Sequence, residues 1–135
     1  MTPQFRNSFD NIQFRNFVLN ISAVLRYAHD KAILENDTYR LKYREDLRGC
    51  RLEKARGNAI TQPQEQEFRP VQDRAGAFHT LPPRAEAEIE NPDIFLYPDG
   101  SASAAEWKFT DAAGHEMTVK VFPESGDVSV EEEDA

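Results

Sequence analysis

The strongest constraint on this chain is an apolar stripe with helical spacing between residues 14 and 36. Its members recur at intervals of mostly three and four residues: Phe14, Phe17, Val18, Ile21, Leu25, Ala28 and Ala32. At about 100° of rotation per residue, these side chains lie on one side of an α-helix. Asn20 and Asp30 fall toward the other side, and Asn36 tolerates the left-handed backbone of a helix end. The stripe predicts a helix that packs a single face against a core and ends at Asn36-Asp37.

A second, shorter stripe precedes the first one. Phe5, Phe9 and Ile12 have the helical spacing i, i+4, i+7, but they point roughly 180° away from the first stripe if the helix is continuous. A single core cannot cover both sides. Either the helix breaks near Asn7-Ser8, with Ser8 as a new N-cap, or it continues and protrudes with its far face available to a neighbouring molecule. The spacing alone leaves both interpretations open.

Beyond residue 36 the apolar period changes to two. Residues 38–44 alternate apolar with basic side chains, and the alternation resumes at residues 50–55. In the last third, turn signals such as Pro98-Asp99-Gly100 separate short apolar runs at 94–97, 107–109, 117–122 and 128–130. Short strands separated by turns indicate an antiparallel meander. The expected fold class is therefore α+β, with a long N-terminal amphipathic helix packed on antiparallel β-sheet.

Residues 57–93 are the least regular part of the sequence. They hold five of the eight prolines and few large apolar side chains, which is typical of a long connection. The alternation of Glu86, Glu88 and Glu90 with apolar residues predicts an exposed edge strand. The predicted organisation has three parts. They are a helical stalk and helix over 1–36, a β-rich head over 37–130 that includes the variable region 57–93, and an acidic, frayed tail over 131–135.

Charge is divided unevenly along the chain. The net charge of −8 combines +4 over residues 1–60 (11 basic, 7 acidic) with −12 over residues 61–135 (5 basic, 17 acidic). No nucleic-acid partner is expected, because neutralising phosphates requires a basic surface. The basic run between residues 40 and 56 is either the solvated face of strands or a docking patch for an acidic partner. The docking interpretation gives three candidate interface residues, Arg40, Arg44 and Arg48.

The sequence carries no signature of catalysis or of a metal site. It has no glycine-rich phosphate-binding loop and no Gly-x-Ser-x-Gly motif. His29, His79 and His115 are scattered, without the spacing of zinc ligands. The single cysteine, Cys50, excludes an internal disulfide and is expected to be a small packed side chain, while Trp107 is expected in the core. We therefore expect no catalytic residue, metal or cofactor.

Several of these segments together resemble one known family. The helix end Val24–Asn36 is similar to the LRYAR-x-x-AI-x-x-N helix end of H-type minor pseudopilins (GspH), which the related FimT and FimU minor pilins share. His29 stands where the family usually has arginine. The order of the later segments is also similar: a strand directly after the helix, Pro98-Asp99-Gly100-Ser101, Gly114, Met117–Val121 and Ser125-Gly126-Asp127-Val128. The resemblance covers the helix and the last third, and residues 57–93 match nothing in the family.

The resemblance implies a non-enzymatic subunit of the type II secretion pseudopilus with a pilin-like fold. Such subunits sit at the periplasmic face of the bacterial inner membrane, anchored by an N-terminal hydrophobic helix that is processed and methylated. No stretch of this sequence approaches the ~18 apolar residues that cross a bilayer. The chain is therefore expected to correspond to the periplasmic part alone. The implied partners are other minor and major pseudopilins and the secretion machinery, with Phe5, Phe9 and Ile12 facing neighbouring subunits.

Two other classes of function remain as alternatives. A FimT/FimU-like minor pilin would serve a type IV pilus or DNA uptake, but relatives that bind DNA resemble one another in a basic C-terminal region, whereas Glu131–Glu133 make this one acidic. A small β-rich enzyme or ligand-binding module would need convergent polar groups in a concave site, and the sequence offers no such set.

Overall fold

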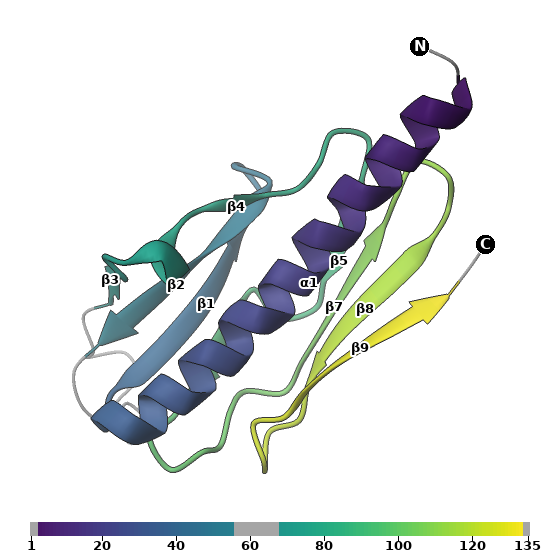
Figure 1. Cartoon of the computed structure of the whole chain (residues 1–135). Helices are drawn as coiled ribbons and strands as arrows, with labels where there is room; N and C mark the ends of the chain where they lie inside the picture. The colour runs from purple at the N-terminus through teal and green to yellow at the C-terminus, as the bar shows by residue number, and fades with distance from the viewer. Residues whose placement is uncertain (1–2, 56–67, 134–135) are drawn as a thin grey trace.

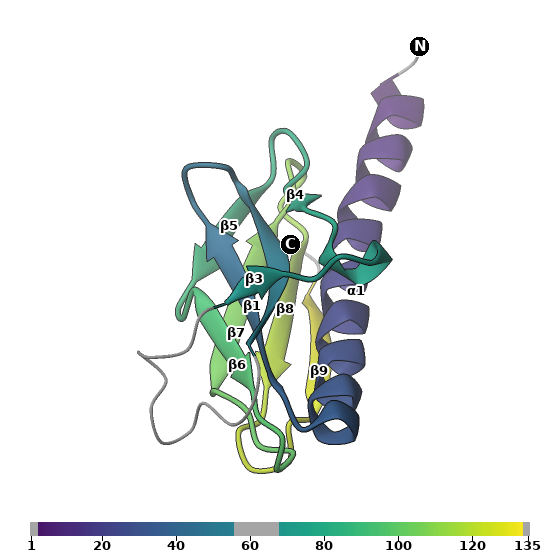
Figure 2. The ribbon, with the colours of Figure 1, turned by 90° about the vertical axis from the view of Figure 1, so that its left-hand side faces the viewer.

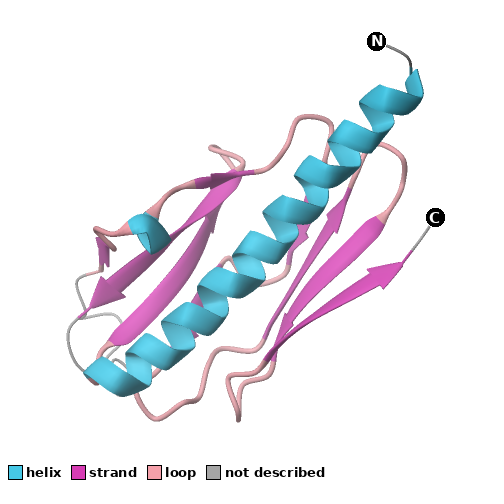
Figure 3. Ribbon diagram, viewed as in Figure 1, coloured by secondary structure: helices cyan, strands magenta, loops and turns pink. Residues whose placement is uncertain are grey.

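The computed structural model describes the backbone of residues 3–55 and 68–133, and the side chains of these ranges from residue 10 onward. One helix, α1 (Pro3–Glu35), packs against two antiparallel sheets, which lie on either side of it in Figure 1 and are distinguished from loops in Figure 3. This arrangement confirms the expected α+β fold class. Asn36 has a φ of 59° and ends α1, as the sequence predicts.

The chain passes back and forth between the two sheets. The first sheet has the order β3-β2-β1-β6, and β4 also pairs with β2. Its strands are β1 (Thr38–Arg44), β2 (Gly49–Ala55), β3 (Arg69–Pro70), β4 (His79–Thr80) and β6 (Asp93–Leu96). The second sheet has the order β5-β7-β8-β9. Its strands are β5 (Glu86–Ile89), β7 (Ala105–Thr110), β8 (Glu116–Val121) and β9 (Val128–Glu133). A short 3₁₀ helix, η2 (Arg74–Gly76), precedes β4.

The helix is continuous through the position where a break was one of two expectations. α1 begins at Pro3 and passes through Asn7 and Ser8, so the interpretation of Ser8 as a new N-cap is wrong. In Figure 2 the first turns of α1 extend beyond both sheets. Helical backbone bonds from neighbouring turns satisfy the amide groups at Ser8, which therefore need no cap. The continuous, protruding helix is the form that the structure adopts.

The core lies where the helix meets both sheets. All seven residues of the Phe14–Ala32 stripe are buried. The ring of Phe17 meets that of Phe109 on β7 edge-on at 5.2 Å, and Tyr43 on β1 meets Trp107 on β7 at 5.6 Å. Trp107 is fully buried, and its Nε1–H donates to the backbone oxygen of Asn91 at 2.6 Å. These aromatic pairs join the helix to the second sheet and the two sheets to each other.

The sequence predicted one outer segment of the second sheet correctly and another one wrongly. β5 is the edge of the second sheet, which confirms the edge strand expected around Glu86–Glu90. The frayed tail expected from residue 131 is wrong for Glu131–Glu133, since these residues continue β9 and pair with β8. Residues 134–135, and residues 57–67 of the variable region, lie outside the described part of the chain.

Candidate functional site

The outward side of α1 carries large apolar side chains that the head does not cover. Ile12 is 57% exposed and Leu19, two turns later, is 44% exposed. Both lie opposite the buried stripe. Leu19 is a residue that the sequence analysis missed, although extending the spacing of the upstream stripe by seven residues from Ile12 reaches it. Phe5 and Phe9, which the sequence spacing predicts on the same side, lie outside the residues whose side chains the structure describes.

Polar contacts on both flanks fix which side of α1 faces outward. On one flank Arg15 pairs with Glu132, and Nη2 of Arg26 donates to the backbone oxygen of Val128 at 3.2 Å. On the other flank the hydroxyl of Tyr27 donates to Asp73 at 2.9 Å. Because the head holds the helix from both flanks, rotation of α1 cannot bury Ile12 and Leu19 against it. The strip between these contacts is available to a second molecule.

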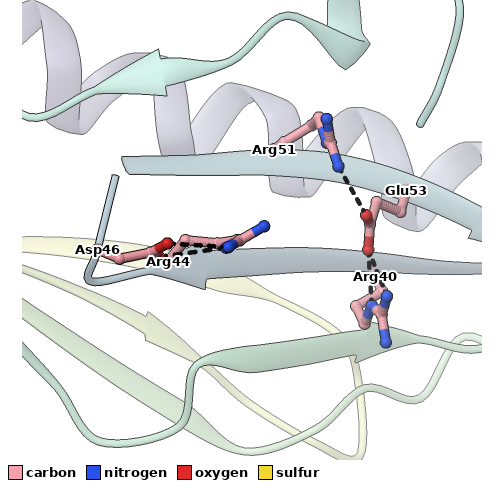
Figure 4. Close-up of polar contacts among 5 residues, drawn as sticks. All are labelled: Arg40, Arg44, Asp46, Arg51 and Glu53. Atoms are coloured by element: carbon pink, nitrogen blue, oxygen red, sulfur yellow. Dashed lines mark hydrogen bonds and ion pairs between the residues drawn. The ribbon is translucent and has the colours of Figure 1, made fainter. Parts of the chain in front are cut away.

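The structure separates the three arginines that the sequence grouped as a docking patch. Arg40 and Arg44 lie on the outer face of β1, where Arg40 pairs with Glu53 and Arg44 pairs with Asp46 at 2.9 Å (Figure 4). Arg48 lies in the turn after β1 with a φ of 51°, and its Nη2 donates to the backbone oxygen of Ala85 at 2.6 Å. Arg48 therefore serves a different surface from the other two.

A groove of about 980 Å³ runs between the C-terminal half of α1 and the segment that follows β3. The hydroxyl of Tyr39 donates to Glu35, and Nζ of Lys54 lies 3.2 Å from the same carboxylate. The hydrogen bond from Tyr39 lowers the pKa of Glu35, while burial, followed by the contact with Glu35, raises the pKa of Tyr39. At neutral pH the carboxylate stays charged and the phenol stays protonated. Neither group has a pKa suited to general acid–base catalysis.

His29 connects the C-terminal half of α1 to one turn of each sheet. Its Nε2 lies 3.2 Å from the backbone oxygen of Gly100 and 3.1 Å from that of Ser125. Gly126, beside the second contact, is buried with a φ of 72°. Its Nδ1 lies 3.5 Å from the carboxylate of Asp30, which is exposed to solvent. Because Nε2 faces two backbone oxygens, we interpret the imidazole as a positioning group between the helix and the ends of the head.

The cysteine and the other two histidines are not placed for catalysis. Cys50 is fully buried on β2, and burial raises the pKa of its thiol to about 12, which leaves almost no reactive thiolate at neutral pH. Burial also lowers the pKa of His79. Nδ1 of His115 lies 3.0 Å from Asp111 in the turn before β8. Within residues 3–55 and 68–133, no three His, Cys, Asp or Glu residues are grouped so that they could hold a metal ion.

Across the described ranges, the structure contains no helix that combines the length and the apolar character needed to cross a bilayer.

Comparison with known proteins gives matches at the level of structure only. No protein-family model and no curated protein sequence matches the chain. The minor pseudopilin EpsH from the type II secretion system of Vibrio cholerae superposes with a TM-score of 0.70, at 11% identity, over 88% of this chain and 95% of that one. GspH of Escherichia coli gives 0.65 at 15% identity, over 90% and 89% of the two chains. The type IV minor pilin FimU of Pseudomonas aeruginosa gives 0.57 at 10% identity, over 96% and 92%.

These matches show which fold the chain has. At identities of 10–15%, structural similarity establishes a shared fold, and a shared fold does not by itself establish function. The resemblance drawn from the helix end and the order of strands is confirmed at that level. The chain has the long helix and two antiparallel sheets of the minor pseudopilin and minor pilin structures.

Proposed function

We propose that this chain is the helix and head of a minor pseudopilin, a non-enzymatic structural subunit of the type II secretion pseudopilus. In this role it helps to export folded proteins across the outer membrane. The observation that carries the proposal is the uncovered apolar strip on α1, which protrudes from a head that grips the helix on both flanks. A subunit held in a filament by helix packing needs such a strip.

Burial of this strip against another subunit would lower the free energy of the assembled state. Removing apolar surface from water stabilises by roughly 25 cal/mol per Å², so covering two half-exposed side chains of the size of Ile12 and Leu19 contributes about 1–3 kcal/mol in total. That amount alone gives only weak association once the entropy cost of binding is included. The proposed assembly therefore combines this strip with further contacts along the same helix. Phe5 and Phe9 are the proposed contacts upstream.

We place the protein at the periplasmic face of a bacterial inner membrane. Its partners in this proposal are other minor and major pseudopilins, and its anchor is a hydrophobic helix in continuation of α1. The first turns of α1 lead away from the head, so such a helix would hold the head clear of the bilayer (Figure 2). Arg40 and Arg44 remain proposed contacts of the head with a partner subunit, and Arg48 is a proposed contact on a separate surface.

A minor pilin of a type IV pilus is the second candidate, favoured by the structural similarity to FimU. The similarity to EpsH and GspH, with higher TM-scores, supports the pseudopilin more strongly. Deleting the gene in the bacterium that encodes it separates the two. The pseudopilin proposal expects the loss of secreted proteins from the medium with surface pili retained. Loss of pili with secretion intact would favour the second candidate.

Charge placed on the strip is expected to abolish assembly without unfolding the head. We expect the double variant Ile12→Asp and Leu19→Asp to reduce secretion to the level of the deletion strain, because two carboxylates cannot be buried in an apolar helix contact. Both side chains are exposed in the subunit, so its melting temperature should change by less than about 4 °C. Asn20→Asp adds one negative charge, half the charge of the double variant, at an exposed position beside the strip and should retain secretion. Normal secretion by the double variant would contradict the proposal.

A further inference from the structure

The outer face of the first sheet carries a concentration of positive charge. Along β1 the apolar residues point into the core, and the residues between them, Arg40, Lys42 and Arg44, point outward. Arg51 on β2 lies directly opposite Lys42 in the register. Glu53 offsets part of this charge, since its two carboxylate oxygens are shared between Arg40 and Arg51 (Figure 4).

A shallow hollow of about 50 Å³ lies within this basic face. Its walls are Lys42, Arg44, Leu47, Arg51, Glu53 and Phe78. Lys42 has no ion-pair partner among the described residues, and Leu47 and Phe78 are exposed large apolar side chains. Aromatic residues and arginine are enriched in protein interfaces, so Phe78 beside Arg44 and Arg51 fits an interface. We refer to these six residues as the basic hollow.

The outer face of the second sheet has the opposite charge. Its outward positions hold six glutamates and two lysines: Glu86, Glu88, Glu106, Lys108, Glu116, Lys120, Glu131 and Glu133. Glu116 and Glu133 lie directly opposite each other on β8 and β9. Nζ of Lys108 lies 3.4 Å from Glu116 and Nζ of Lys120 lies 3.1 Å from Glu131, so ion pairs offset part of this charge, but the six glutamates still outnumber the two lysines. We refer to these eight positions as the acidic face.

We infer that the basic hollow of one copy binds the acidic face of a second copy, head to tail. The two surfaces belong to different sheets, which lie on different sides of α1 (Figure 1). A contact between different surfaces of identical subunits repeats from copy to copy, and it produces an open array when the rotation does not close. The inference rests on the proposed function for its setting in a filament. It names the second copy as the partner and gives the heads a side-by-side contact distinct from the strip on α1.

Charge complementarity favours a second copy over a nucleic acid as the occupant. A polyanion approaching the basic hollow would meet a molecule of net charge −8, whose acidic face repels phosphates. Another copy presents rows of carboxylates across its second sheet. In the hollow that they would face, Lys42 has no ion-pair partner among the described residues, and Arg44 and Arg51 each pair with one carboxylate.

Sedimentation velocity with complementary charge reversals tests the contact. The basic-side variant is Lys42→Glu with Arg44→Glu, and the acidic-side variant is Glu86→Lys with Glu133→Lys. The wild-type chain should associate at about 20 mM salt and weaken at least about tenfold at about 500 mM, where screening is nearly complete over a few ångströms. Each variant alone should associate at least about tenfold more weakly. An equimolar mixture should recover association, because each reversed surface then meets its complement. Arg74→Glu, a reversal away from both surfaces, should behave as the wild type.

The outcomes separate this contact from the helix-mediated one. A wild-type chain that stays monomeric up to about 0.5 mM at low salt overturns the head-to-tail contact, and so does a mixture that fails to recover association. The Leu19→Asp variant should associate as the wild type does in this assay. Sedimentation could support the head-to-tail contact while the Leu19→Asp variant still secretes normally in cells. That combination would refute only the role of the strip on α1.

Discussion

Replacing Leu25 by alanine is expected to lower the free energy of unfolding by about 2–5 kcal/mol, whereas the same replacement at Leu34 should change it by less than about 0.5 kcal/mol. Leu25 is 0% exposed in the centre of the buried stripe, and Leu34 is 78% exposed on the same helix. Both replacements remove the same atoms and alter helix propensity equally. The difference between them therefore isolates the packing of α1 on the sheets from the intrinsic stability of the helix.

Urea denaturation followed by circular dichroism measures both free energies. A loss of several kcal/mol is a large fraction of the stability of a domain of this size, so Leu25→Ala should shift the urea midpoint far more than Leu34→Ala. Equal effects at the two positions would mean that the head does not hold α1 in solution. In that case the assignment of an outward side to the helix would be lost as well.

Gly126→Ala is expected to be the second most damaging change, at about 2–4 kcal/mol. Gly126 has a backbone φ of 72°, a conformation that residues with a side chain rarely adopt. A Cβ at this position would lie 2.5 Å from the backbone oxygen of Gly100 and would collide with the imidazole of His29. Because one of the two obstacles is backbone, a side-chain rotation cannot relieve the overlap. The contact of His29 with both turns should be lost.

Gly100→Ala is the matched control for this prediction. Gly100 also has a positive φ, of 90°, but the nearest atom to an added Cβ is Cδ1 of Ile33 at an ordinary contact distance of 3.6 Å. We expect only the backbone cost, about 1 kcal/mol. Thermal denaturation of the two variants compares them directly. If the melting temperatures fall by the same amount, steric contact with His29 and Gly100 does not determine the packing of the two turns.

Periodicity predicted the parts of the fold in which one face of an element is buried. The Phe14–Ala32 stripe gave the helix and its packed face, and alternation gave β1 and most of the later strands, because burial on one side imposes a period on the sequence. The continuity of α1 through Ser8 was one of two interpretations that the spacing left open. A serine suits both an N-cap and an exposed helical position, and only the helical backbone on both sides of it decides between them.

The features that the sequence did not predict depend on contacts between residues far apart in the chain. The run Glu131–Glu133 shows no alternation, so it did not reveal that pairing with β8 would extend β9 to Glu133. A pairing partner lies outside the local pattern. Arg48 was grouped with Arg40 and Arg44 by sequence distance, but the left-handed turn at Arg48 directs it to Ala85. His29 contacts turns that lie 71 and 96 residues away, so its positioning role has no local signal.

Photo-cross-linking from position 19 is the most direct test of the claim that the outward side of α1 binds a neighbouring subunit. The protein, carrying a photoreactive phenylalanine analogue in place of Leu19, is irradiated in the cells that produce it, and Arg74 is replaced in the same way as the control. We predict a covalent product with another pilin-like subunit from position 19 and none from position 74, which lies on η2 away from the strip. No product from position 19, or equal products from both positions, would contradict the account.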